Sequence, residues 1–130
     1  MARLQLQYDM PDSPCVAARG KTINSLGDYS MLWAISCTDK PNTAAARAAV
    51  LQPHRDYLKS QKGILVLAGA TQTDDGATAL GSLFVVNVKT RAEAKAFSDG
   101  DPFTRTGVFA SIVITRMNKG QWNPEAAEGA

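Results

Sequence analysis

The order of strand-like and helix-like segments along this chain is the feature that most constrains its fold. Four segments are rich in apolar and β-branched residues, and two segments carry polar residues at helical spacing. The strand-like segments are Met31–Thr38, Ile64–Ala70, Leu80–Val88 and Val108–Met117, and the helix-like segments are Thr43–Lys62 and Arg91–Ser98. The chain therefore runs strand, helix, strand, strand, helix, strand.

This order predicts an α+β fold of the ferredoxin-like βαββαβ type, with an antiparallel sheet and both helices on one face. The strands are apolar on both sides, so the face without helices needs a cover. Sheet-on-sheet packing with a second copy of the chain supplies one. We therefore expect a homodimer.

Local signals mark the ends of the helices. Thr90 and Glu93 have the spacing of a capping box. Asp101 and Pro102 suit the N-cap and first position of one further short turn. Pro53 interrupts the first helical segment, where it either kinks the helix or lies in the first turn of its second half.

The segments divide the 130 residues into one folded domain with additions at both ends. We expect residues 1–30 to form an irregular N-terminal extension, in which Leu4–Tyr8 is a candidate strand. Residues 31–124 form the domain, and residues 125–130 are a C-terminal tail.

Charge and composition exclude several functional classes. The net charge is only +2 and the basic residues are scattered, which argues against a nucleic-acid partner. No apolar run approaches the length of a membrane span, and Met1–Ser30 has no secretory signal, so we expect a cytoplasmic protein. Two distant cysteines and one histidine are too few for a four-ligand zinc site, and no glycine-rich phosphate loop is present. We therefore expect no metal and no cofactor.

The single histidine, His54, is the residue best suited to proton transfer near neutral pH. It is either a buried histidine with a satisfied hydrogen bond or a catalytic base. A base needs an orienting acceptor, for which Asp99 and Asp101 are the candidates, although Asp101 also fits a simple N-cap. No serine lies in a nucleophile elbow, which argues against a serine hydrolase. The reaction class that remains is cofactor-independent proton transfer on a small organic molecule.

Five short motifs occur in order between Met31 and Pro124, and together they resemble the YCII-related domain family. Leu51 stands where many members have an arginine, whereas Arg47, one turn earlier, is retained. The first thirty residues lie outside the resemblance. The motifs are Pro53-His54-Arg-Asp-Tyr57-Leu58, Leu67-Ala-Gly69, Gly81-Ser82-Leu83, Asp101-Pro-Phe103 and Gly107-Val-Phe109.

The resemblance implies a dimeric α/β barrel of ferredoxin-like protomers and a His–Asp dyad, which falls on His54 and Asp101. One activity assigned in the family is the dehydrochlorination of a chlorinated hydroxyhydroquinone, a lyase reaction in the breakdown of chlorinated aromatic compounds. His54 would remove a ring hydroxyl proton, the ring would become a ketone, and chloride would leave. The alternative is a non-catalytic dimeric module that binds a small molecule.

Five further residues are expected to contact a substrate. Arg47 would stabilise a phenolate or the leaving chloride, Gly69 would approach the ligand, and Phe103, Phe109 and Trp33 would form walls for a flat ring. Alternatively, each aromatic residue belongs to the core, and Arg47 is a solvated residue on the helix surface. Two further hypotheses are a purely structural dimer and a haem ligated by the single histidine.

Overall fold

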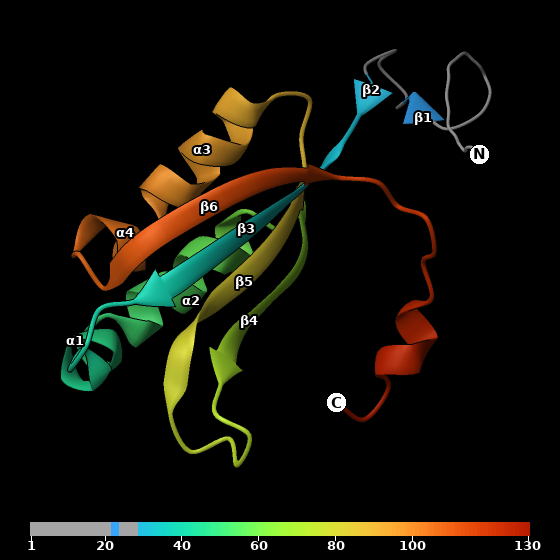
Figure 1. The fold of residues 1–130 in the computed structure, drawn as a ribbon. Helices are drawn as coiled ribbons and strands as arrows, with labels where there is room; N and C mark the ends of the chain where they lie inside the picture. Colours follow the sequence, from blue (N-terminus) through green and yellow to red (C-terminus); the bar gives the residue numbers. More distant parts are fainter. Residues whose placement is uncertain (1–21, 24–28) are drawn as a thin grey trace.

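The structure, a computed structural model, describes residues 22–23 and 29–130 (Figure 1). The strands are β1 (Thr22–Ile23), β2 (Tyr29–Ser30), β3 (Leu32–Asp39), β4 (Leu65–Gln72), β5 (Ala79–Asn87) and β6 (Phe109–Met117). The helices are α1 (Ala44–Ala49), α2 (Leu51–Ser60), α3 (Arg91–Gly100), α4 (Pro102–Arg105) and the 3-10 turn η1 (Pro124–Ala127).

The four long strands form one antiparallel sheet in the order β4-β5-β3-β6. The helices α1 to α4 lie on one side of this sheet (Figure 1). This arrangement confirms the predicted α+β, ferredoxin-like fold. In the centre of the sheet, Cys37 of β3 pairs with Ser82 of β5 on one side and with Ile112 of β6 on the other.

The core lies between the sheet and the helices. Alternate residues of the central strands point into it, as the two-residue period of a strand requires. The helices contribute Ala94 and Phe97 from α3 and Phe103 from α4. The buried apolar residues of the strands are Trp33, Ile35 and Cys37 of β3, Phe84 and Val86 of β5, and Phe109 of β6.

The opposite face of the sheet carries apolar side chains that no helix of the chain covers. Leu67 and Val113 are each 56% exposed, and Leu83 and Met117 are 37% and 41% exposed. The pairing register places these residues on the face opposite Ile35 and the other core positions. The described part of the chain thus has one covered and one uncovered sheet face.

Pro53 divides the first helical segment. α1 ends at Ala49, Val50 is not helical, and Pro53 is the third residue of α2. A proline ring clashes with the carbonyl group four residues earlier, which here belongs to Ala49, so one continuous helix is excluded. In the first turn of a helix the missing N–H group costs nothing. This confirms the second of the two predicted positions for Pro53.

Both predicted caps are present. Thr90 Oγ1 accepts a hydrogen bond from the Glu93 amide at 3.1 Å. The Glu93 carboxylate accepts from the Lys89 amide at 3.0 Å, one residue before the N-cap. Asp101 caps α4, where its Oδ1 atom accepts from the Phe103 amide at 2.9 Å. These bonds fix the start of the two helices that follow β5.

Only four residues of the expected N-terminal extension are described, and they form the antiparallel pair β1-β2. The candidate strand Leu4–Tyr8 lies outside the described residues. Among the residues that the structure does describe, no helix has the length and apolar character needed to cross a membrane. In the same part of the chain, no group of three or more His, Cys, Asp or Glu residues is arranged to hold a metal ion.

Candidate functional site

His54 and Asp101 meet beneath the helices, although 47 residues separate them in sequence. His54 lies on the inner face of α2, and Asp101 joins α3 to α4. The His54 Nδ1 atom and the Asp101 Oδ1 atom are 2.7 Å apart. Only 7% of His54 and 1% of Asp101 are exposed. The two residues therefore form a buried His–carboxylate pair.

Asp101 is both the partner of His54 and the N-cap of α4. Its Oδ1 atom accepts from the Phe103 amide and also contacts His54 Nδ1. Its Oδ2 atom is buried and has no hydrogen-bond partner among the described residues. The other candidate acceptor, Asp99, instead pairs with Lys95 at 2.8 Å on the exposed surface of α3. Of the two candidates, the structure places Asp101 against His54.

The imidazole of His54 is also held by aromatic contacts. It stacks on the Phe103 ring, with centroids 3.8 Å apart and an interplanar angle of 11°. Phe84 approaches it edge-on with a centroid distance of 6.2 Å. A carboxylate at Nδ1 favours the tautomer with its proton on that nitrogen, which leaves the Nε2 lone pair able to accept a proton. The arrangement is suited to general-base chemistry.

Arg47 lies in the same region, and its side chain does not occupy the solvated helix position that was the alternative to a substrate contact. Its Nε atom donates to Asp39 Oδ2 at 2.8 Å. Its Nη2 atom donates to the Gly81 carbonyl at 2.8 Å and to Ser82 Oγ at 2.7 Å. The guanidinium carbon lies 4.6 Å from the centre of the Phe103 ring. The alternative is wrong because α1 directs the side chain inward to the ends of β3 and β5.

Asp39 and Ser82 were not among the predicted site residues. Asp39 lies just beyond the predicted strand Met31–Thr38, although it continues the two-residue alternation of Ile35 and Cys37. That alternation was the available signal that its carboxylate faces the helices. Ser82 pairs with Cys37 across the sheet, and no feature of the sequence alone indicates that pairing.

Cys37 lies close to both carboxylates of this region. Burial, followed by the negative charges of Asp101 and Asp39 and opposed by the positive charge of Arg47, raises the pKa of its thiol to about 12. The thiol is therefore protonated at neutral pH and is a poor nucleophile. Cys37 thus contributes to the core as a small apolar residue.

The remaining predicted contact residues divide into two groups. Phe109 lies edge-on to Phe103 at a centroid distance of 5.9 Å, and both rings are buried in the core. Trp33 lies four residues from Cys37 along β3, about 13 Å away, where its Nε1 atom donates to the Val88 carbonyl. Gly69 pairs with Leu83 on the uncovered face of the sheet. The structure thus brings Phe103, Phe109 and Arg47 to the His54–Asp101 pair, but not Trp33 or Gly69.

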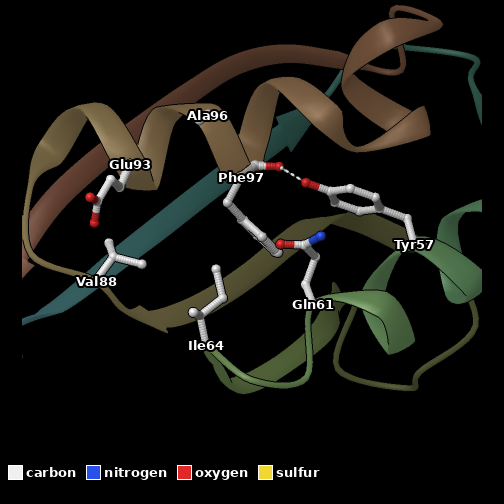
Figure 2. Close-up of a pocket in the computed structure, with 7 residues that line it drawn as sticks. All are labelled: Tyr57, Gln61, Ile64, Val88, Glu93, Ala96 and Phe97. Atoms are coloured by element: carbon white, nitrogen blue, oxygen red, sulfur yellow. Dashed lines mark hydrogen bonds between the residues drawn. The ribbon is translucent and has the colours of Figure 1, made fainter. Parts of the chain in front are cut away.

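A surface groove of about 470 Å³ lies between α2 and α3 (Figure 2). His54 and Asp101 do not line it. Tyr57, one turn after His54, donates from its hydroxyl to the Phe97 carbonyl at 2.7 Å. Burial, followed by the charges of Asp101 and Asp99, raises the pKa of this hydroxyl. The lining residues are Tyr57, Gln61, Ile64, Val88, Glu93, Ala96 and Phe97.

Comparison with known proteins places these features in a family. The solved structure of 5-chloro-2-hydroxyhydroquinone dehydrochlorinase (TftG) from Burkholderia phenoliruptrix, in complex with 2,5-dihydroxybenzoquinone, is similar to this chain with a TM-score of 0.64. The two chains are 28% identical, and the match covers 69% of this chain and 96% of the other. No curated protein matches the chain. The model of the YCII-related domain matches residues 31–118. The chain therefore belongs to the YCII-related domain family.

Proposed function

We propose that this chain is a cofactor-independent enzyme that moves protons on a small aromatic or quinone-type molecule. The observation that carries the proposal is the buried His54–Asp101 pair, with its 2.7 Å contact at Nδ1. Histidines held by a carboxylate in this way recur as general bases in enzymes. In this assignment His54 is the base, and Asp101 orients its imidazole and stabilises the imidazolium.

The reaction that we propose is dehydrochlorination of a chlorinated hydroxyhydroquinone, and the likeness to a dehydrochlorinase supports it. His54 Nε2 takes a proton from a ring hydroxyl and delivers it to the carbon that carries chlorine, so the ring becomes a ketone. The electron pair of a second deprotonated hydroxyl then expels chloride. One proton and one chloride leave as HCl, and a hydroxyquinone forms. The departing chloride takes the electron pair that the ring loses, so no external oxidant is needed.

Neighbouring residues have secondary roles in the proposal. Arg47 adds a positive charge next to the anionic ring through Nη1, an atom that no hydrogen bond among the described residues uses. Phe103 and Phe109 form the apolar side of the site. Trp33 and Gly69 receive no substrate contact, since the single chain places them away from the pair.

We also propose that the active molecule is a homodimer that buries the uncovered sheet face. Leu67, Leu83, Val113 and Met117 are exposed on that face in the single chain. Exposed apolar patches of this kind mark interaction surfaces, and a second identical sheet matches this one in shape and chemistry.

The proposed reaction is tested by following chloride release and quinone absorbance with 5-chloro-2-hydroxyhydroquinone. The variant His54→Ala should lower kcat by at least about a hundredfold, the contribution expected of a general base. An equal rate in the variant would show that His54 takes no part in the chemistry.

The variant Asp101→Asn separates the two roles of Asp101. Asparagine caps helices as well as aspartate does, so folding should change little, but the charge that stabilises the imidazolium is lost. We expect a large fall in kcat, whereas Asp99→Asn, on the exposed surface of α3, should leave the rate unchanged. If no variant and no native protein turns over, yet 2,5-dihydroxybenzoquinone binds, the non-catalytic binding module is the better assignment.

A further inference from the structure

The Phe103 ring contacts both His54 and Arg47. The His54 ring stacks on it at 3.8 Å, and the Arg47 guanidinium carbon lies 4.6 Å from its centre. Its backbone amide is bound to the same Asp101 oxygen that contacts His54 Nδ1. Phe103 is 1% exposed. The position of the Phe103 ring therefore limits the positions that the His54 imidazole can take.

Arg47 is itself tightly held. Three hydrogen bonds from Nε and Nη2, to Asp39, to the Gly81 carbonyl and to Ser82, fix the plane of the guanidinium. The side chains of Arg47 and Asp39 are only 13% and 7% exposed. Buried ion pairs of this kind add little net stability, because the desolvation of both charges offsets their attraction. A fixed, planar cation of this kind can instead orient the ring that it contacts, which here is Phe103.

We infer that Asp39 and Arg47 are positioning residues that hold the Phe103 ring and, through it, the plane of the His54 imidazole. This inference rests on the proposed function for its catalytic consequence. The imidazole turns about its Cα–Cβ and Cβ–Cγ bonds, and a single hydrogen bond at Nδ1 tolerates a range of ring angles. A stacked ring narrows that range by fixing the plane of the imidazole. The direction of Nε2 matters for proton transfer, since a displacement of about 1 Å can lower a rate about a hundredfold.

Lysine cannot replace arginine in this arrangement. Its ammonium group keeps the positive charge but has no planar face to place over Phe103, and no fork to bind Asp39 and the Gly81 carbonyl together. The variant Arg47→Lys therefore separates charge from positioning. If Arg47 acts only through its charge, the lysine variant should behave like the native protein.

The test uses the fact that His54 is the single histidine in the chain. Diethyl pyrocarbonate modifies unprotonated imidazole, and its rate reports how accessible and how firmly held the His54 ring is, without any need for turnover. We expect Arg47→Lys to raise this rate by about threefold or more, within the range of coupling between contacting residues. Arg55→Lys, on the exposed face of α2, is the matched control and should not change it.

A double-mutant cycle with Phe103→Leu shows whether Arg47 acts through the ring. If it does, Arg47→Lys should raise the modification rate in the native background and have no further effect once Phe103 is leucine. Equal effects in both backgrounds, or no effect in the native one, would overturn the inference. Asp39→Asn gives a milder form of the same cycle if Arg47→Lys does not fold.

Turnover adds a second readout when kcat is calculated per folded molecule, because a loss of stability lowers only the fraction of folded enzyme. Where the proposed substrate is converted, Arg47→Lys should lower kcat more than it raises KM. A change confined to KM would assign Arg47 to substrate binding and reject its positioning role. If no turnover is seen in any protein, the proposed reaction fails, and the modification rates still decide the inference.

Discussion

Asp101 shows how one carboxylate oxygen joins two structural tasks. Oδ1 accepts from the first turn of α4 and also contacts His54 on α2. The cap requires the aspartate side chain to lie across the start of α4, and this orientation directs the same oxygen toward the facing helix. Asp101 therefore makes both contacts at once, the cap of α4 and the pair with His54. The kinetics of Asp101→Asn test whether the same carboxylate also acts in catalysis.

The buried thiol of Cys37 leads to a prediction about alkaline stability. Its pKa is raised from 9.0 to about 12, so between these values the unfolded chain loses the proton and the folded chain keeps it. The unfolded state then binds fewer protons, and the free energy of unfolding falls as pH rises, by up to about 1.4 kcal/mol per pH unit. The stabilisation is complete below pH 9 and is lost toward pH 12.

Urea unfolding between about pH 8 and about pH 11 measures this slope. The variant Cys37→Ala should be less stable at the lower pH because it leaves a small cavity, but its stability should fall less steeply with pH. Tyrosine and lysine titrations contribute equally to both proteins and cancel in the comparison. Parallel slopes would show that the folded protein tolerates the thiolate at Cys37.

At the level of helices and strands, sequence periodicity predicted the order and position of the elements of the main sheet. Met31–Thr38 was expected and Leu32–Asp39 was found, because an apolar, β-branched run has few alternatives. The sequence did not predict the break between the two helices at Val50, because Pro53 is compatible with either a kinked helix or the first turn of a new one. Strand pairing is a tertiary property, so the sequence did not show that Ser82 would lie beside Cys37.

The same distinction explains what was predicted of the site. His54 and Asp101 have unusual residue types at recognisable positions, a lone histidine on a helix and an Asp-Pro turn. The Arg47–Asp39 pair depends instead on how α1 packs against the strand ends. Phe103 and Phe109, which were expected to form walls for a flat ring, are buried beside the His54–Asp101 pair. Burial of this kind is decided by packing rather than by local pattern.

Gly81 packs against β3 and also accepts a hydrogen bond from Arg47. Its close approach to β3 predicts that one added methyl group lowers the stability of the fold. A Cβ atom at Gly81 would overlap the Cys37 carbonyl oxygen, whereas a Cβ atom at Gly63, in the exposed turn before β4, would meet nothing within 4 Å. Gly81→Ala should therefore lower the free energy of unfolding by about 3 kcal/mol or more. Gly63→Ala should change it by less than about 0.5 kcal/mol. Equal urea midpoints for the two variants would contradict the register of β3 and β5.

At the scale of the whole molecule, the two faces of the sheet have different partners. The helices bury one face together with the His54–Asp101 pair, while the other face presents Leu67, Leu83 and Val113 to solvent. A monomer with this surface would be prone to association, since contiguous apolar patches seldom remain exposed in soluble proteins. Pairing of two such faces through a two-fold axis closes the surface and prevents open-ended growth.

The proposed dimer predicts the result of placing one charge on the uncovered face. Leu83 lies on the interior strand β5, so Leu83→Glu would put a carboxylate within the contact, where it has no partner and its desolvation opposes association. By light scattering at micromolar concentration, the native protein should show twice the chain mass and Leu83→Glu the chain mass. Lys59→Glu, which adds the same charge to the exposed surface of α2, should remain dimeric. A native protein with the mass of one chain would reject the dimer, and the apolar face would then need another occupant.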